Sequence, residues 1–167
     1  MKKNVFTIFL LLLVASMNAQ NVKPCSTPES KQFDFWVGDW DLTYSDTMHA
    51  TNKIEHDFDG CVIHEKFYDP NQNFRGESWS MYNPVLNIWQ QTWVDNQGSY
   101  FALTGKFENN EMLLFTAPQT LKKGGVGYNK MRFYNITPDS FDWSWELTRD
   151  EGKTWNVVWS IRYSRKK

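Results

Sequence analysis

Residues 54–67 read IEHDFDGCVIHEKF, which has the composition of two β-strands joined by a tight turn. The dipeptide Asp59-Gly60 favours a two-residue hairpin turn, because both residue types tolerate a positive φ. With this turn, Glu55 lies opposite His64 in an antiparallel ladder. The stretch therefore predicts a β-hairpin with a defined register.

The same pattern continues in both directions from this hairpin. Segments rich in β-branched and aromatic residues alternate with turn residues at the spacing of an all-β meander. Such short connections make neighbouring strands antiparallel, and about ten of them avoid open edges by closing into an up-and-down barrel. The predicted fold is thus an all-β, antiparallel β-barrel of about ten strands. We expect the strands near residues 36–45, 49–58, 61–69, 74–83, 87–95, 99–108, 111–117, 130–137, 140–148 and 154–164.

Two segments depart from the strand pattern. Thr27 and Pro28 resemble an N-cap and a first helical residue, so a short helical turn is expected over residues 28–33. The glycine-rich stretch 121–129 is expected to be a loop. Its glycines lack the spacing of a phosphate-binding loop.

The whole chain has the composition of one globular domain. It has 167 residues, of which 41% are hydrophobic and 22% charged, and its formal net charge is -1. Affinity for nucleic acid comes mainly from clustered Lys and Arg, whereas the basic residues here are scattered. We therefore expect no nucleic-acid partner.

The N-terminus has the order of a secretory signal peptide. Lys2 and Lys3 precede an apolar run over residues 5–14, and small residues follow up to Ala19. The run is too short for a membrane-spanning helix, so we expect no transmembrane segment in the mature chain. The sequence predicts a signal peptide over residues 1–20, an N-terminal segment over 21–32, a barrel domain over 33–167, and a secreted or periplasmic protein.

Two cysteines, Cys25 and Cys61, lie in the expected mature chain. An even number of cysteines in an oxidising compartment favours a disulfide. Two unpaired thiols are the alternative, and the absence of a CxxC motif gives thiol catalysis little support.

Nine tryptophans are many for a chain of this length, and several come in pairs at even spacing. Even spacing places both members of a pair on one face of a strand. Aromatic walls with a few polar groups are typical of a small-molecule pocket. Simple alternation, with the polar side chains in water, is the competing interpretation. The candidate ligand-binding residues are Trp79, Trp93 and Trp145 as apolar walls, with Glu65, Glu77, Gln91 and Arg132 as polar anchors.

The predicted neighbours Glu55 and His64 have two interpretations. They could form a carboxylate-oriented imidazole that acts as a base or a metal ligand. A surface ion pair is favoured instead. Because His49 and His56 do not complete a three-ligand set, we expect no metal site.

Residues 35–40, FWVGDW, contain a Gly-x-Trp motif on the first expected strand, and Arg162 lies on the last. This pairing resembles the lipocalin and calycin superfamily, in which the first-strand Trp packs at the closed end of the barrel under an Arg from a late strand. The resemblance implies structural roles for Trp40 and Arg162 through stacking of the guanidinium on the indole.

A longer resemblance covers nearly all of the expected mature chain. The order FDFWVGDW, DGCVIHE, MYNP, IWQQTWVDNQG, LTGKFENNEMLLF, RDEGKTW and IRYSR is similar to the bacterial domain-of-unknown-function family 1579, which is thought to be calycin-like. That family has no established activity, so the resemblance implies a fold and export rather than a function. It also implies the pairing of Cys25 with Cys61.

Ten-stranded calycins include haem-binding nitrobindins, whose haem-ligating His comes late in the chain. The last His here is His64, so haem is disfavoured and we expect no cofactor.

Three functions are compatible with these features of the sequence. The leading hypothesis is a secreted or periplasmic barrel that binds a small hydrophobic or aromatic molecule in its interior. The second is a barrel enzyme of the cyclase or isomerase type, with Glu65 or Glu77 as general acid or base. The third is a module that contacts a protein or glycan through exposed aromatic residues. The sequence leaves the oligomeric state open.

Overall fold

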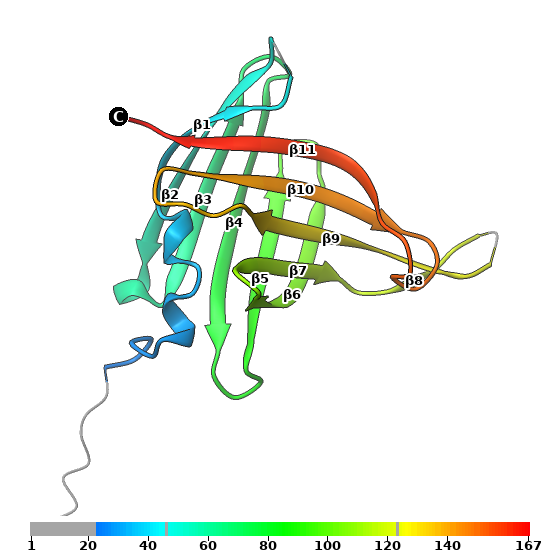
Figure 1. The fold of residues 1–167 in the computed structure, drawn as a ribbon, viewed down its shortest axis with the longest axis horizontal. Coiled ribbons are helices and arrows are strands. Elements are labelled where there is room, and N and C mark those ends of the chain that lie inside the picture. Colours follow the sequence, from blue (N-terminus) through cyan, green and yellow to red (C-terminus); the bar gives the residue numbers. More distant parts are fainter. Residues whose placement is uncertain (1–22, 46, 123) are drawn as a thin grey trace, which may run out of the picture.

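The computed structural model describes residues 23–45, 47–122 and 124–167. It is an antiparallel β-barrel of ten strands, closed by pairing of β11 with β1 (Figure 1). Sequential strands pair around the barrel, except that β7 pairs directly with β9, and the short strand β8 pairs with β9 alone. The predicted fold class is confirmed. The strands are β1 (Gly38–Thr43), β2 (His49–Asp57), β3 (Val62–Asp69), β4 (Phe74–Asn83), β5 (Ile88–Asp95), β6 (Tyr100–Glu108), β7 (Glu111–Thr116), β8 (Gln119–Thr120), β9 (Val126–Tyr134), β10 (Ser140–Thr148) and β11 (Asn156–Arg165).

The predicted signal peptide, residues 1–20, lies outside the described residues. Among the residues that are described, no helix is long and apolar enough to cross a membrane.

The hairpin of β2 and β3 has the predicted register, with Glu55 opposite His64. Its turn is the 3-10 turn η3 (Phe58–Gly60), in which Asp59 has a φ of 59° and Gly60 a φ of 88°. Phe58 also has a positive φ, of 48°, so the left-handed backbone extends one residue beyond the Asp59-Gly60 pair that the sequence predicted.

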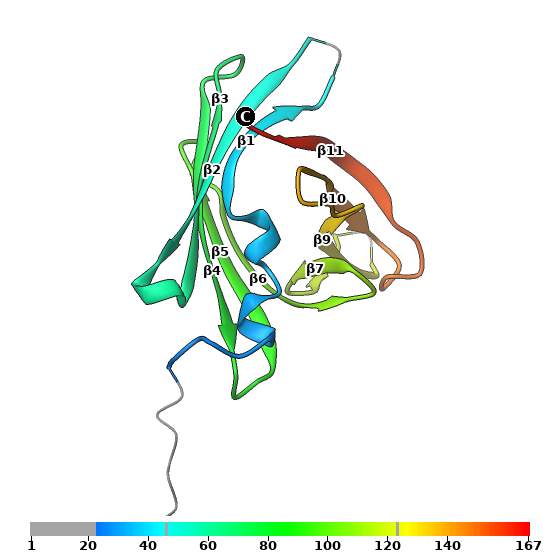
Figure 2. The ribbon, with the colours of Figure 1, turned by 60° about the vertical axis from the view of Figure 1, so that its left-hand side comes forward.

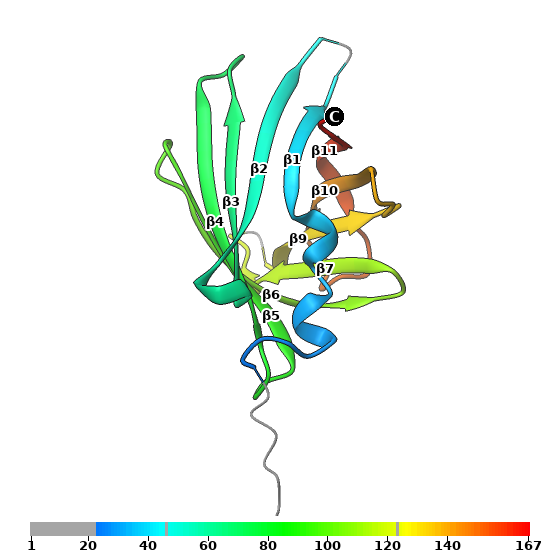
Figure 3. The ribbon, with the colours of Figure 1, turned by 90° about the vertical axis from the view of Figure 1, so that its left-hand side faces the viewer.

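Two helical turns, η1 (Glu29–Lys31) and η2 (Asp34–Trp36), lie across one end of the barrel (Figure 2). Between them, the fully buried Phe33 packs against Trp89 of β5 and Phe133 of β9, with ring centroids 5.4 and 5.0 Å apart. Because these strands are not neighbours in the barrel, the segment closes this end. Figure 3 shows the same turns leading directly into β1.

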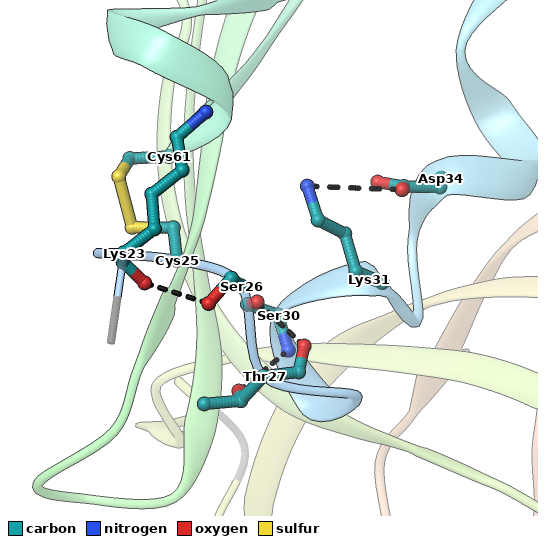
Figure 4. Close-up of a disulfide and its surroundings, with 8 residues drawn as sticks. All are labelled: Lys23, Cys25, Ser26, Thr27, Ser30, Lys31, Asp34 and Cys61. Atoms are coloured by element: carbon teal, nitrogen blue, oxygen red, sulfur yellow. Dashed lines mark hydrogen bonds and ion pairs between the residues drawn. A yellow bond between two sulfur atoms is a disulfide. The ribbon is translucent and has the colours of Figure 1, made fainter. Parts of the chain in front are cut away.

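A disulfide fixes the start of this segment to the barrel wall. Cys25 is bonded to Cys61, directly after η3, with a Cα–Cα distance of 5.1 Å (Figure 4). The predicted pairing is confirmed. The predicted helical turn is present as η1, but it begins one residue later than expected, with Pro28 rather than Thr27 at its N-cap. The Thr27 hydroxyl still accepts a hydrogen bond from the backbone N–H of Ser30 at 3.3 Å.

The guanidinium that stacks on Trp40 belongs to Arg165, which corrects the role predicted for Arg162. The Arg165 guanidinium carbon lies 4.2 Å from the Trp40 ring centroid, and the side chain also donates to backbone carbonyls at the closed end. Arg162 points to the outer face of β11, where it pairs with Asp142 at 2.9 Å. The reason is strand alternation, since both chain neighbours of Arg162 are buried in the barrel.

The segment 121–129, expected to be a loop, is partly strand, since β9 begins at Val126. Gly127 lies within this strand, where an added Cβ would stand 3.0 Å from the Thr148 carbonyl oxygen. The glycine therefore permits close backbone packing, rather than marking a loop.

Candidate functional site

A cavity of about 230 Å³ occupies the barrel interior beyond the closed end. Trp36, from the helical turn that closes the barrel, contributes to its wall, and Gln97 and Ser99 belong to the loop between β5 and β6 at the opposite end. Most of the wall is aromatic. Its aromatic residues include Trp36, Phe67, Trp93, Trp143, Trp145 and Trp159.

The aromatic wall follows from period-two alternation along the strands. Trp143 and Trp145 are two residues apart on β10, and Trp145 stands opposite Trp159 of β11 in the ladder. The rings of Trp143 and Trp159 meet edge to face, with centroids 5.5 Å apart. Such edge-to-face packing holds the rings rigidly and leaves apolar ring surface along the cavity.

Glu65 of β3 is the buried acid of this cavity, with only 5% of its surface exposed. Its carboxylate accepts hydrogen bonds from Asn52 Nδ2 at 2.6 Å and from Ser78 Oγ at 2.5 Å. Burial raises the pKa of Glu65 to about 7, against the opposing effect of these two donors. The carboxyl can therefore gain or lose a proton near neutral pH.

Asn52 connects this carboxyl to a buried phenol. Its Nδ2 also donates to Tyr163 Oη at 3.1 Å. Burial, and then the nearby charge of Glu65, raise the pKa of Tyr163 well above its ordinary value, so the phenol stays neutral. Within the described residues, Trp36 Nε1 and Asn52 Oδ1 are buried and have no hydrogen-bond partner. Trp36 lines the cavity, so its Nε1–H is an unpartnered donor that a bound molecule can use, whereas Asn52 is not part of the cavity wall.

Gln91 of β5 supports Glu65 from behind rather than lining the cavity. Its Nε2 donates to Ser78 Oγ at 3.3 Å and to Ser80 Oγ at 2.9 Å. Ser78 in turn donates to Glu65. The predicted anchor Gln91 is thus buried beside the site and acts through Ser78.

A second acid, Asp95, lies in the cavity wall at the end of β5. Burial acts to raise its pKa, but hydrogen bonds from Trp93 Nε1 at 3.0 Å and from the backbone N–H of Ser99 at 3.0 Å outweigh this effect and lower it. The Trp93 indole also crosses Gly76, where an added Cβ would stand 2.0 Å from its Cζ2 atom. Asp95 and Gly76 together fix the position of this ring.

Two predicted residues of β4 lie on the outer face, which corrects their assignment to the interior. Glu77 has 48% of its side chain exposed and contacts His64 Nε2 at 2.8 Å, while Trp79 stacks on the His64 ring with centroids 4.8 Å apart. The reason is alternation, since the inward positions of β4 hold Ser78 and Ser80. His64 is accordingly paired with Glu77, not with its ladder neighbour Glu55.

Arg132 of β9 also points outward, contrary to its prediction as an anchor. It makes two hydrogen bonds to Glu111 of β7, at 2.7 and 2.5 Å, and lies 4.3 Å from the Tyr134 ring centroid. Its neighbours Met131 and Phe133 take the inward positions. Of the seven predicted ligand-binding residues, the cavity wall contains Glu65, Trp93 and Trp145.

Several wall residues were not predicted, although alternation could have found some of them. Phe67 lies two residues after Glu65, and Trp143 lies two residues before Trp145, so each shares a face with a predicted residue. Asn52, which contacts Glu65 but is not part of the cavity wall, had no such signal. It contacts Glu65 because β2 and β3 pair in the observed register.

The described residues contain no group of three or more His, Cys, Asp or Glu side chains placed to hold a metal ion. The expectation of no cofactor stays a prediction. In comparisons with known proteins, no family model matches the chain, and no curated protein matches it. The resemblance to family 1579 likewise stays a prediction.

Proposed function

We propose that the protein binds a small, largely apolar or aromatic molecule inside the barrel. The observation that carries this proposal is the aromatic-walled cavity of about 230 Å³ with a buried carboxyl group in its wall. Ligand sites combine apolar walls with a few placed polar groups in this way.

The distribution of the tryptophans favours an interior ligand over an external partner. Five tryptophans, including Trp143 and Trp159, line the cavity, whereas Trp79 lies on the outer face. Closure of one end by the helical turns leaves the loops of the other end as the route by which a ligand would enter.

We propose further that the protein works outside the cytoplasm after export by the signal peptide, and that it belongs to the family it resembles. The disulfide between Cys25 and Cys61 is compatible with an oxidising compartment.

Native mass spectrometry of the protein purified from its periplasmic or secreted fraction tests the proposal. A stoichiometric small molecule that dissociates on denaturation is the expected result. A Trp159→Leu variant should lose it, whereas Trp79→Leu, altered on the outer face, should retain it. An empty barrel, together with no saturable change in tryptophan fluorescence on titration with lipid, haem and aromatic compounds, would overturn the proposal.

Glu65 favours a second candidate function, a barrel enzyme in which this residue is the general acid or base. The specific observation is a carboxyl group in the cavity wall whose pKa, raised by burial, is about 7. Such an enzyme with Glu65→Gln should accumulate unconverted substrate. The molecules released from the wild-type protein and from Glu65→Gln would then differ in chromatographic retention. Identical molecules would exclude Glu65 as the general acid or base.

A further inference from the structure

We propose that the ligand is a small organic cation, a protonated amine or a quaternary ammonium on an apolar or aromatic body, with its charge directed toward Glu65. This inference rests on the proposed interior binding and adds the chemical class of the ligand.

The first argument is the lack of a cationic partner for Glu65. Its two hydrogen-bond donors, Asn52 and Ser78, are neutral. Within the described part of the chain, no lysine or arginine lines the cavity. The basic side chains of β9 are engaged elsewhere, Lys130 with Glu146 at 2.8 Å and Arg132 with Glu111. A buried carboxylate without a counter-charge is costly, and a cationic ligand would supply that charge.

The second argument is the aromatic surface beside this acid. Phe67 shares the inner face of β3 with Glu65, and its ring centroid lies 6.2 Å from that of Trp93 and 6.0 Å from that of Trp159. Ring faces attract cations through their quadrupole, and aromatic enclosures recognise ammonium groups for this reason. An anion would meet the same faces unfavourably.

The third argument is the sign of the remaining ionisable groups around the cavity. Asp95 of β5 has a lowered pKa and stays ionised, and Tyr163 of β11 stays neutral. Both acids in the wall therefore favour positive charge, and the tyrosine does not oppose it. A fatty acid or another carboxylate would lack a cationic partner in this cavity.

Three compounds with the same aromatic body test the charge preference directly. We would titrate phenethylamine, 2-phenylethanol and 3-phenylpropionate into the protein at pH 8 by isothermal calorimetry. The amine should bind at least tenfold more tightly than the alcohol, and the carboxylate least. This comparison needs no variant, so it does not depend on the folding of a mutant.

Glu65→Gln, checked for folding by circular dichroism, should remove the preference for the amine. The control Glu108→Gln, which removes an exposed acid of β6, should preserve it. Amine binding to the wild-type protein below pH 7 should also release a proton, visible as a dependence of the measured heat on the ionisation enthalpy of the buffer.

Equal or tighter binding of the alcohol or the carboxylate would overturn the cation assignment while leaving interior binding intact. Retention of the preference in Glu65→Gln would overturn the role of Glu65. Failure of all three compounds to bind, combined with an empty barrel in native mass spectrometry, would overturn the proposed function itself.

Discussion

Replacing Glu65 by Gln should stabilise the empty protein, and increasingly so as the pH rises. Burial raises the pKa of this carboxyl from 4.5 to about 7 in the folded state. At pH values below 4.5 the group is protonated in both the folded and the unfolded protein. As the pH rises from there to about 7, the unfolded chain releases this proton while the folded protein retains it, so the free energy of unfolding falls.

The size of this effect follows from the two pKa values. Each pKa unit corresponds to about 1.4 kcal/mol, so ionisation of Glu65 costs the folded state on the order of 3 kcal/mol above pH 7. Gln keeps the shape and an acceptor for Asn52 but carries no charge. Between pH 5 and pH 8.5, the free energy of unfolding of the variant should therefore rise by up to about 3 kcal/mol relative to that of the wild-type protein.

Urea denaturation of both proteins across this pH range, followed by circular dichroism, measures the difference. Glu108→Gln is the control, because it removes an acid that is exposed. It would refute the reasoning if the free energies of unfolding of Glu65→Gln and the wild-type protein differed by the same amount at pH 5 and at pH 8.5. That result would mean that this carboxyl titrates alike in the folded and unfolded states.

Three further perturbations have defined outcomes. Replacing both Cys25 and Cys61 by Ser should lower the free energy of unfolding in guanidinium by roughly 3 to 4 kcal/mol, from the loop-closure entropy of the unfolded chain, and an unchanged midpoint would contradict this. Arg165→Ala should lower the free energy of unfolding by about 1 to 3 kcal/mol in the same assay, because stacking and hydrogen bonds are lost. Arg162→Ala should lower it by under about 1 kcal/mol. Equal losses in the two variants would argue against Arg165 as the residue that stacks on Trp40. Gly76→Ala should displace the indole that crosses it, shift tryptophan emission and weaken ligand binding at least tenfold, so wild-type affinity would show that this ring does not shape the cavity.

Local pattern was sufficient to predict much of the fold. The turn at Asp59-Gly60 determined the register that places Glu55 opposite His64. Turn residues and short connections likewise located most strands to within a few residues, because these features act between neighbours in sequence.

The candidate site was predicted only in part. Glu65 and Glu77 both stand among apolar residues in β-strands, yet the first faces the cavity and the second faces solvent. The alternation of side chains along a strand separates two faces, but it does not identify which face points into the barrel. The inward face is set when the sheet closes and its apolar face is buried, which involves all the strands together.

The sequence by itself determined the antiparallel hairpins, the ten strands of the barrel and the cysteine pair available for a disulfide, since each depends on residue types and short spacings. Tertiary structure alone decided that Arg165, not Arg162, covers Trp40, and that Asn52 and Ser78 converge on Glu65. Those contacts join different strands, and their geometry exists only after the barrel has closed. The proposed function depends on that closure, because it brings a buried carboxyl and the aromatic rings around one cavity.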